Sequence, residues 1–99
     1  MDIKLINRGD TGELILNGRL DSNTADDTLA IINDVSDRFP NIKLNMSGLK
    51  YISSAGLRVL KLTYMKVNKS GGSLSITNVD PMVMEVFEMT GFASFLSFE

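Results

Sequence analysis

The chain has 99 residues, 43% of them hydrophobic, and its ten Lys and Arg residues against twelve Asp and Glu residues give a formal net charge of −2. That length suits one modest hydrophobic core, so we expect a single domain over residues 1–99. The chain has no cysteine and no histidine, which excludes disulfides, thiolate chemistry, imidazole catalysis and nearly all zinc sites. We therefore expect neither a cofactor nor a metal.

The charges are mixed along the chain and form no basic block. Because binding to a phosphate backbone needs such a block, the sequence predicts no nucleic-acid partner. No apolar run approaches the roughly 20 residues of a membrane span, and the N-terminal segment has neither the basic nor the apolar part of a signal peptide. We expect a cytoplasmic protein with no membrane partner.

The first twenty residues predict a β-hairpin. Two short runs rich in Ile and Leu, IKLIN and ELILNGRL, are separated by RGDTG, whose two glycines and Asp10 are typical of a turn.

An amphipathic helix is predicted next, ending at Pro40. From Ala25 to Phe39 the apolar residues recur at steps of three and four, and aspartates in the first turn suit the positive end of the helix dipole. The candidates for its N-cap are Ser22, Asn23 and Thr24.

The middle of the chain predicts a strand, a connection and a second helix. NIKLNM, residues 41–46, alternates apolar and polar positions as a half-buried strand does, and SGLKY, residues 47–51, is predicted as a connection. Residues 55–69 carry an apolar stripe at helical spacing, and KSGG ends that helix.

The last third predicts a strand, a third helix and a closing segment. SLSITNV, residues 73–79, alternates as a strand does, and Asp80 followed by Pro81 is a typical helix start, with Gly91 as the stop. FASFLSFE then predicts either a last strand or a short helical segment followed by a strand.

Three methionines crowd the third helix. This helix is predicted to turn Val83, Val86 and Phe87 inward. Helical spacing also predicts that Met82 and Met89 pack in the core, and that Met84 lies nearer the surface.

Taken in order, these elements predict a small α/β fold: a mixed sheet of four to five strands with three to four helices packed against it.

The stretch YISSAGLRVL places Ser53 and Ser54 where a strand gives way to a helix. A serine there accepts a hydrogen bond from a free backbone N–H, which is worth about 1 kcal/mol relative to alanine. The same position accepts a phosphate, because the helix start offers unpaired N–H groups and a positive dipole end. The residues alone favour a cap over a switch.

The segment MSGLKYISSAGLRVL is similar to the signature of STAS domains, the family shared by anti-sigma-factor antagonists and the cytoplasmic tails of sulphate transporters. The resemblance covers the whole chain, since NGRLDSNTA resembles an earlier family segment and GGSLSITNVDPMVMEVFEMTGFASFLSFE its closing part. Three separated matches in the right order are far more specific than a serine pair.

The resemblance implies a phosphoacceptor at Ser54 and a nearby loop aspartate at Asp21. Two positions depart from the family pattern: Ser53 stands where an aspartate is common, and Ala55 stands where a second hydroxyl residue is common. Modification of Ser53 instead of Ser54, or of both, stays open. Asp21 is equally well interpreted as a turn residue and as a kinase-recognition residue. The implied partner-binding residues are Asp21, Ser53, Ser54, Gly56 and Arg58.

The function implied by the resemblance is that of an anti-sigma-factor antagonist, a bacterial regulator of transcription that switches partners. In its unphosphorylated form it would bind an anti-sigma factor that is also a serine kinase with a histidine-kinase-like ATP fold, and so free a sigma factor. Phosphorylation at Ser54 would end that complex, and a serine phosphatase would restore it. The protein would be a substrate and a ligand, not an enzyme.

Two alternatives stay beside this hypothesis. One is a stand-alone STAS subunit that regulates a lipid-transport or secretion complex without phosphorylation. The other is a small enzyme with Ser53 or Ser54 as nucleophile, which the lack of a histidine to activate the serine disfavours. The oligomeric state is not determined by the sequence.

Overall fold

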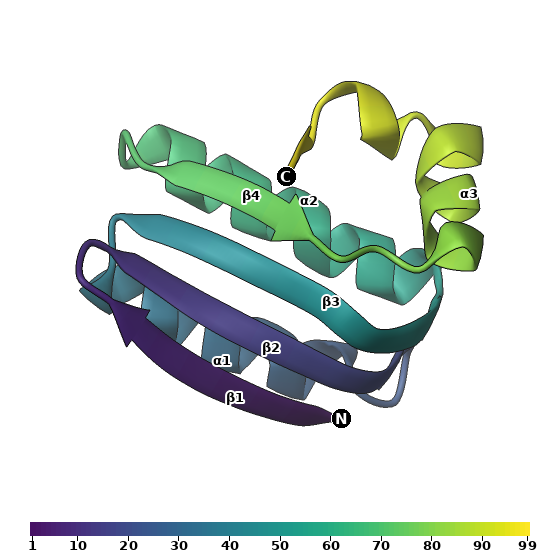
Figure 1. The fold of residues 1–99 in the computed structure, drawn as a ribbon, viewed down its shortest axis with the longest axis horizontal. Helices are drawn as coiled ribbons and strands as arrows, with labels where there is room; N and C mark the ends of the chain where they lie inside the picture. Colours follow the sequence, from purple (N-terminus) through teal and green to yellow (C-terminus); the bar gives the residue numbers. More distant parts are fainter.

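A computed structural model describes residues 1–99 and shows a five-stranded mixed sheet in the order β1-β2-β3-β4-β5 (Figure 1). Strand β1 is antiparallel to β2, and the remaining neighbours are parallel. The predicted α/β fold is confirmed. In chain order the elements are β1 (Asp2–Arg8), β2 (Thr11–Leu20), α1 (Ala25–Arg38), β3 (Asn41–Ile52), α2 (Ser54–Lys69), β4 (Ser73–Thr77), α3 (Pro81–Thr90), the 3₁₀ turn η1 (Phe92–Ser94) and β5 (Ser97–Phe98).

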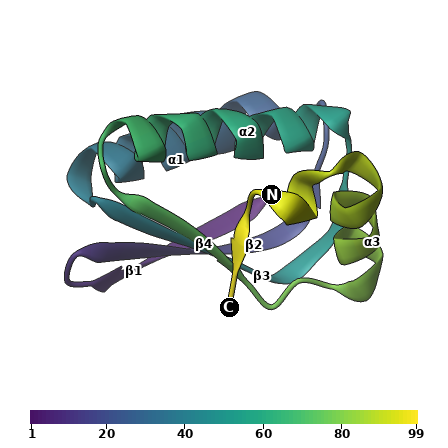
Figure 2. The same cartoon turned by 90° about the horizontal axis from the view of Figure 1, so that it is seen from above.

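The helices are distributed unequally around the sheet. Helices α1 and α2 lie side by side over one face, the opposite face carries no helix, and α3 stands at one end (Figure 2). This layering follows from the parallel pairs, because each crossover between parallel strands must pass over a face of the sheet.

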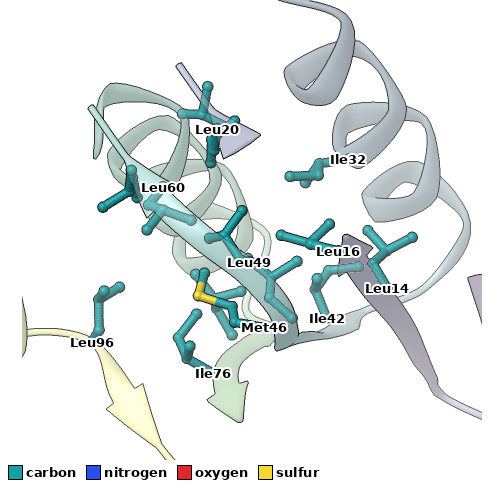
Figure 3. Packing of buried hydrophobic residues seen from close by; sticks show 14 of the residues in the cluster. Leu14, Leu16, Leu20, Ile32, Ile42, Met46, Leu49, Leu60, Ile76 and Leu96 are labelled. Carbon is teal, nitrogen blue, oxygen red and sulfur yellow. The ribbon is translucent and has the colours of Figure 1, made fainter. Parts of the chain in front are cut away.

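The core lies between the sheet and these two helices (Figure 3). Leu14, Leu16 and Leu20 of β2 alternate inward and are fully buried. Ile32 of α1 and Leu60 of α2 meet them from the helix layer and are also fully buried. Each such side chain contributes roughly 1.5–3 kcal/mol of burial free energy.

Strand β3 is longer than the sequence pattern predicts. The connection predicted at residues 47–51 is wrong, because β3 runs on to Ile52, and Leu49 and Ile52 are both buried. Ser47–Gly48 is a pair typical of a turn, but here it lies within the strand. The pairing of β3 with β2 shifts register at two places, and these shifts keep the strand continuous. The extension carries the chain directly to the start of α2.

The methionine prediction for α3 is also wrong. Met82 and Met89 are 73% and 79% exposed, whereas Met84 is half-buried against the core. The prediction that Val83 and Phe87 point inward is confirmed, because both are fully buried. Met82 and Met89 lie seven residues apart on a face that points away from these two residues, and so they are exposed.

The two ends of α3 follow the sequence prediction, whereas the predicted side-chain cap of α1 is not formed. Asp80 caps α3 by accepting from the Met82 N–H at 3.0 Å, and Gly91 ends it with a φ of 84°. Helix α1 has Thr24 at its N-cap, but the hydroxyl makes no cap bond and donates to the Arg19 carbonyl at 2.8 Å. The closing segment takes the second predicted form, a 3₁₀ turn and then a short strand.

Candidate functional site at the start of helix α2

Helix α2 begins directly at the end of β3, with Ser53 as its N-cap. The Ser53 hydroxyl oxygen accepts from the Gly56 N–H at 3.4 Å, a long bond for a cap. The Ser53 carbonyl accepts from the Leu57 N–H at 2.9 Å. The first turn contains no acidic residue. A neutral hydroxyl is therefore the only side-chain cap at the positive end of this helix dipole.

The start of α2 is pressed against the end of β2. The Ser53 N–H donates to the Leu20 carbonyl at 3.0 Å. A Cβ atom placed on Gly56 would lie only 2.7 Å from that same carbonyl oxygen and 2.7 Å from Cγ1 of Ile52. Only glycine allows this close approach, so the position of α2 depends on Gly56.

This contact brings the Asp21 loop beside the serine pair, because Asp21 directly follows Leu20. One Asp21 carboxylate oxygen accepts from the Asn23 N–H at 3.0 Å, and the other lies 3.6 Å from Nε of Arg19. The Asp21 carbonyl accepts from the Ala25 N–H at 2.9 Å. These bonds give Asp21 a structural role in the turn before α1, in agreement with its interpretation as a turn residue.

An arginine and a tyrosine that sequence reasoning missed flank the site. The guanidinium carbon of Arg19 lies 4.1 Å from the ring centroid of Tyr51, a cation–π geometry. Arg19 pairs with Tyr51 across the β2 and β3 ladder. The signal was hidden because residues 47–51 were predicted as a connection, and only a strand places Tyr51 opposite Arg19.

Ser54 is the first residue of α2, and it is exposed, whereas Ser53 is half-buried. It lies at one end of a groove of about 630 Å³ between α2 and the end of α3. Arg58 and Lys61 also line this groove, and neither forms an ion pair within the chain. The apolar lining comes from Leu57, Leu62, Met65 and Phe92.

The structure thus brings together all five residues predicted for partner binding. Ser53, Ser54, Gly56 and Arg58 occupy the first turns of α2, and Asp21 lies in the adjoining loop. No three Asp or Glu side chains lie close enough together to hold a metal ion. None of the helices combines the length and apolar character that a membrane span requires.

The whole arrangement, from β1 to β5, is shared with a known family of domains. A model of the STAS domain matches residues 3–99. The chain belongs to the STAS domain family. BtrV of Bordetella bronchiseptica, named as a candidate anti-sigma factor antagonist, is 43% identical over 53 residues, which are 54% of this chain and 46% of BtrV. The anti-sigma F factor antagonist of Paenibacillus polymyxa is 30% identical over 78 residues, 77% of this chain and 67% of that protein.

Solved structures of STAS relatives share the fold. The anti-sigma factor antagonist SpoIIAA in its unphosphorylated form matches with a TM-score of 0.84 at 20% identity, over 99% of this chain and 88% of SpoIIAA. SpoIIAA of Bacillus in its phosphorylated form matches with a TM-score of 0.76 at 19% identity, over 99% of this chain and 91% of that one. The matches to BtrV and to the Paenibacillus protein span between about half and two thirds of the relatives' lengths.

Proposed function

We propose that this STAS protein is an anti-sigma-factor antagonist controlled by phosphorylation of Ser54. The observation that carries the proposal is the exposed Ser54 at a helix start with no acidic residue in its first turn. Ser54 lies at one end of a groove that is also lined by Arg58 and Lys61, whose side chains form no ion pair. The relatives named as anti-sigma factor antagonists support the kind of partner.

In the unmodified state, the anti-sigma factor docks on the start of α2, the Asp21 loop and the exposed side of α2. The exposed surface there mixes apolar groups with the charges of Arg58 and Lys61. By occupying the anti-sigma factor, the protein releases the sigma factor that this partner otherwise holds. The protein acts by binding and transforms no substrate of its own.

Phosphorylation changes this surface and leaves the fold in place. The partner, as a serine kinase with a histidine-kinase-like ATP fold, transfers the γ-phosphoryl group of ATP to the Ser54 hydroxyl oxygen. The phosphate adds roughly −1.5 to −2 charges at pH 7. The positive end of the α2 dipole accommodates that charge within the protein, and Arg58 lies one turn further along the same helix.

The partner then meets a bulky dianion where it fitted a small hydroxyl, and the complex dissociates. A serine phosphatase removes the phosphate and restores binding. SpoIIAA, which shares the fold, is known in phosphorylated and unphosphorylated forms, and this supports the switch.

The experiment measures displacement of a sigma factor from its complex with the candidate anti-sigma factor. Unmodified protein should release the sigma factor, and protein phosphorylated at Ser54 should bind the anti-sigma factor about a hundredfold more weakly, because an unfavourable charge contact costs several kcal/mol. Ser54→Asp should impair release, whereas Ser70→Asp, an exposed serine at the other end of α2, should not.

Two results would contradict the proposal. Equal release by phosphorylated and unmodified protein would remove the switch. Failure of any form to bind an anti-sigma factor, with binding to a lipid-transport or secretion complex instead, would favour the alternative of a STAS subunit that acts without phosphorylation.

A further inference from the structure

The outer edge of β1 is an unpaired strand edge on the side of the sheet away from α2. Strand β1 is seven residues long and pairs with β2 alone (Figure 1). Its outer backbone N–H and C=O groups therefore have no partner in the sheet. Such an edge is a template for another strand unless a bulge, a proline, a covering segment or charged side chains, lysine above all, block it. DIKLINR contains no proline, and its pairing with β2 is regular.

The side chains of β1 present an apolar patch beside α1. Ile3 and Leu5 lie opposite the fully buried Leu16 and Leu14, so they point to the helix-covered face of the sheet. Both are only half-buried, and with Ile31 of α1, which is 43% exposed, they line an open groove of about 310 Å³. One strand added beside β1 would cover these three side chains.

We propose that a second copy of this chain pairs with β1 in antiparallel orientation and forms a symmetric dimer through this edge. With the two-fold axis at Leu5, each Asp2 lies opposite an Arg8 of the other copy, and Leu5 lies opposite Leu5. Asp2 is exposed and has no ion-pair partner within its own chain. Arg8 bonds Glu13 through Nε alone, which leaves its terminal guanidinium nitrogens for the carboxylate of Asp2.

The charges on β1 select this register over its neighbours. A shift by one residue would turn apolar side chains of one copy to the opposite face from those of the other. A shift by two residues keeps the faces but places Lys4 opposite Lys4 or opposite Arg8, and like charges directly opposite each other are destabilising. Only the register centred on Leu5 combines apolar pairing with opposite charges at both ends.

The dimer is closed and does not continue into a filament. Its two free edges are both formed by β5, which is only two residues long and offers little for a further strand. Helix α2 packs on β3 and β4, so the groove beside Ser54 stays open in the dimer. The dimer is thus independent of the phosphorylation proposed above.

A single cysteine on the two-fold axis tests this geometry directly, because the natural chain has none. Residues opposite each other in an antiparallel pair have Cα atoms about 4.5–5.5 Å apart, which falls within the range that a disulfide spans. Under mild oxidation, Leu5→Cys should become a covalent dimer that a reductant reverses. Met89→Cys, at a 79% exposed position on α3, is the matched control. Equal cross-linking of the two variants would overturn the proposal.

Analytical ultracentrifugation of the natural protein, which contains no cysteine, measures the dimer independently of cross-linking. The natural sequence should show a monomer–dimer equilibrium that shifts with concentration, and Asp2→Lys should weaken the dimer roughly tenfold because the symmetry removes two ion pairs at once. Ile31→Glu should weaken it as well, whereas Met89→Glu should not. A monomer at every concentration of the natural sequence would overturn the proposal.

Discussion

The starts of helices α2 and α3 meet the same need for a hydrogen-bond acceptor, α3 with a charged side chain and α2 with a neutral one. Asp80 caps α3 with a carboxylate at 3.0 Å from the Met82 nitrogen, and Pro81 occupies the first turn. Ser53 caps α2 with a neutral hydroxyl at 3.4 Å from the Gly56 nitrogen. Both helix starts need a hydrogen-bond acceptor, yet only α3 has a permanent negative charge there.

The difference shows which helix start can respond to a change of charge. At α3 the bond from the Met82 N–H lowers the pKa of the Asp80 carboxyl, and Lys50 lies 3.3 Å from its other oxygen. The positive end of the α3 dipole therefore already has a negative charge beside it. At α2 no carboxylate occupies the first turn, so a phosphate on Ser54 would be the first negative charge to enter it.

The largest effect is expected from Gly56→Ala. The added Cβ would lie 2.7 Å from the Leu20 carbonyl oxygen, and backbone cannot move aside as a flexible side chain does. We expect a loss of about 1–3 kcal/mol in the free energy of unfolding, measured by urea denaturation. Ser54→Ala, two residues earlier and exposed, is the control and should change stability by less than about 0.5 kcal/mol. Equal stability of both variants would show that α2 does not rest on the end of β2.

Removal of the two caps should have unequal effects. Ser53→Ala deletes a long, neutral hydrogen bond and should cost less than about 1 kcal/mol. Asp80→Ala deletes a shorter, charge-assisted bond together with the ion pair to Lys50, so it should lower the unfolding free energy more than Ser53→Ala does. Thermal and urea unfolding of both variants give the order, and the reverse order would contradict the comparison.

Acid should loosen α3 before α2. The pKa of Asp80 is lowered below its ordinary value of 3.8. The stability that the ionised carboxylate contributes is therefore fully present above pH 3.8, and it is lost as the pH falls through the lowered pKa of the folded state. We expect hydrogen-exchange protection of the Met82 amide to fall in that range, while protection of the Gly56 amide follows global stability alone. The same loss of protection at both amides would indicate no local effect of Asp80.

The smallest effect is expected from Ser53→Asp, which gives α2 a carboxylate cap like that of α3. The charge should stabilise the helix start by roughly 0.3–1 kcal/mol at low ionic strength, measured by thermal unfolding, and the gain should shrink in salt. Ser70→Asp at the C-terminal end of α2 is the control, where the same charge should be unfavourable.

Much of the fold could be predicted from residues with strong local signals. Asp80–Pro81 marked the start of α3 and Gly91 its end, because a cap and a left-handed stop act on neighbouring backbone groups. RGDTG likewise marked the hairpin turn, because a turn depends on the few residues that form it. The extension of β3 could not be predicted, since Gly48 is typical of a turn and only pairing with β2 keeps it in a strand. The inward positions Val83 and Phe87 of α3 were predicted, whereas the exposure of Met82 and Met89 was not, because helical spacing alone also allowed them in the core.

The position of the predicted site residues in the fold could be predicted, but not the residues that surround them. The motif placed Ser53 and Ser54 at a strand-to-helix junction, and the structure separates them into a half-buried cap and an exposed first helical residue. The Arg19–Tyr51 pair and the groove ending at Phe92 join segments that are distant in the sequence, so no local pattern indicated them.

The central claim is that Ser54, and not the capping Ser53, receives the phosphate. The most direct measurement is the intact mass of the natural protein, Ser54→Ala and Ser53→Ala after incubation with ATP and the candidate kinase. The account predicts a gain of one phosphate in the natural protein and in Ser53→Ala, and none in Ser54→Ala. A phosphate retained by Ser54→Ala, or absent from all three proteins while they still bind the kinase, would contradict it.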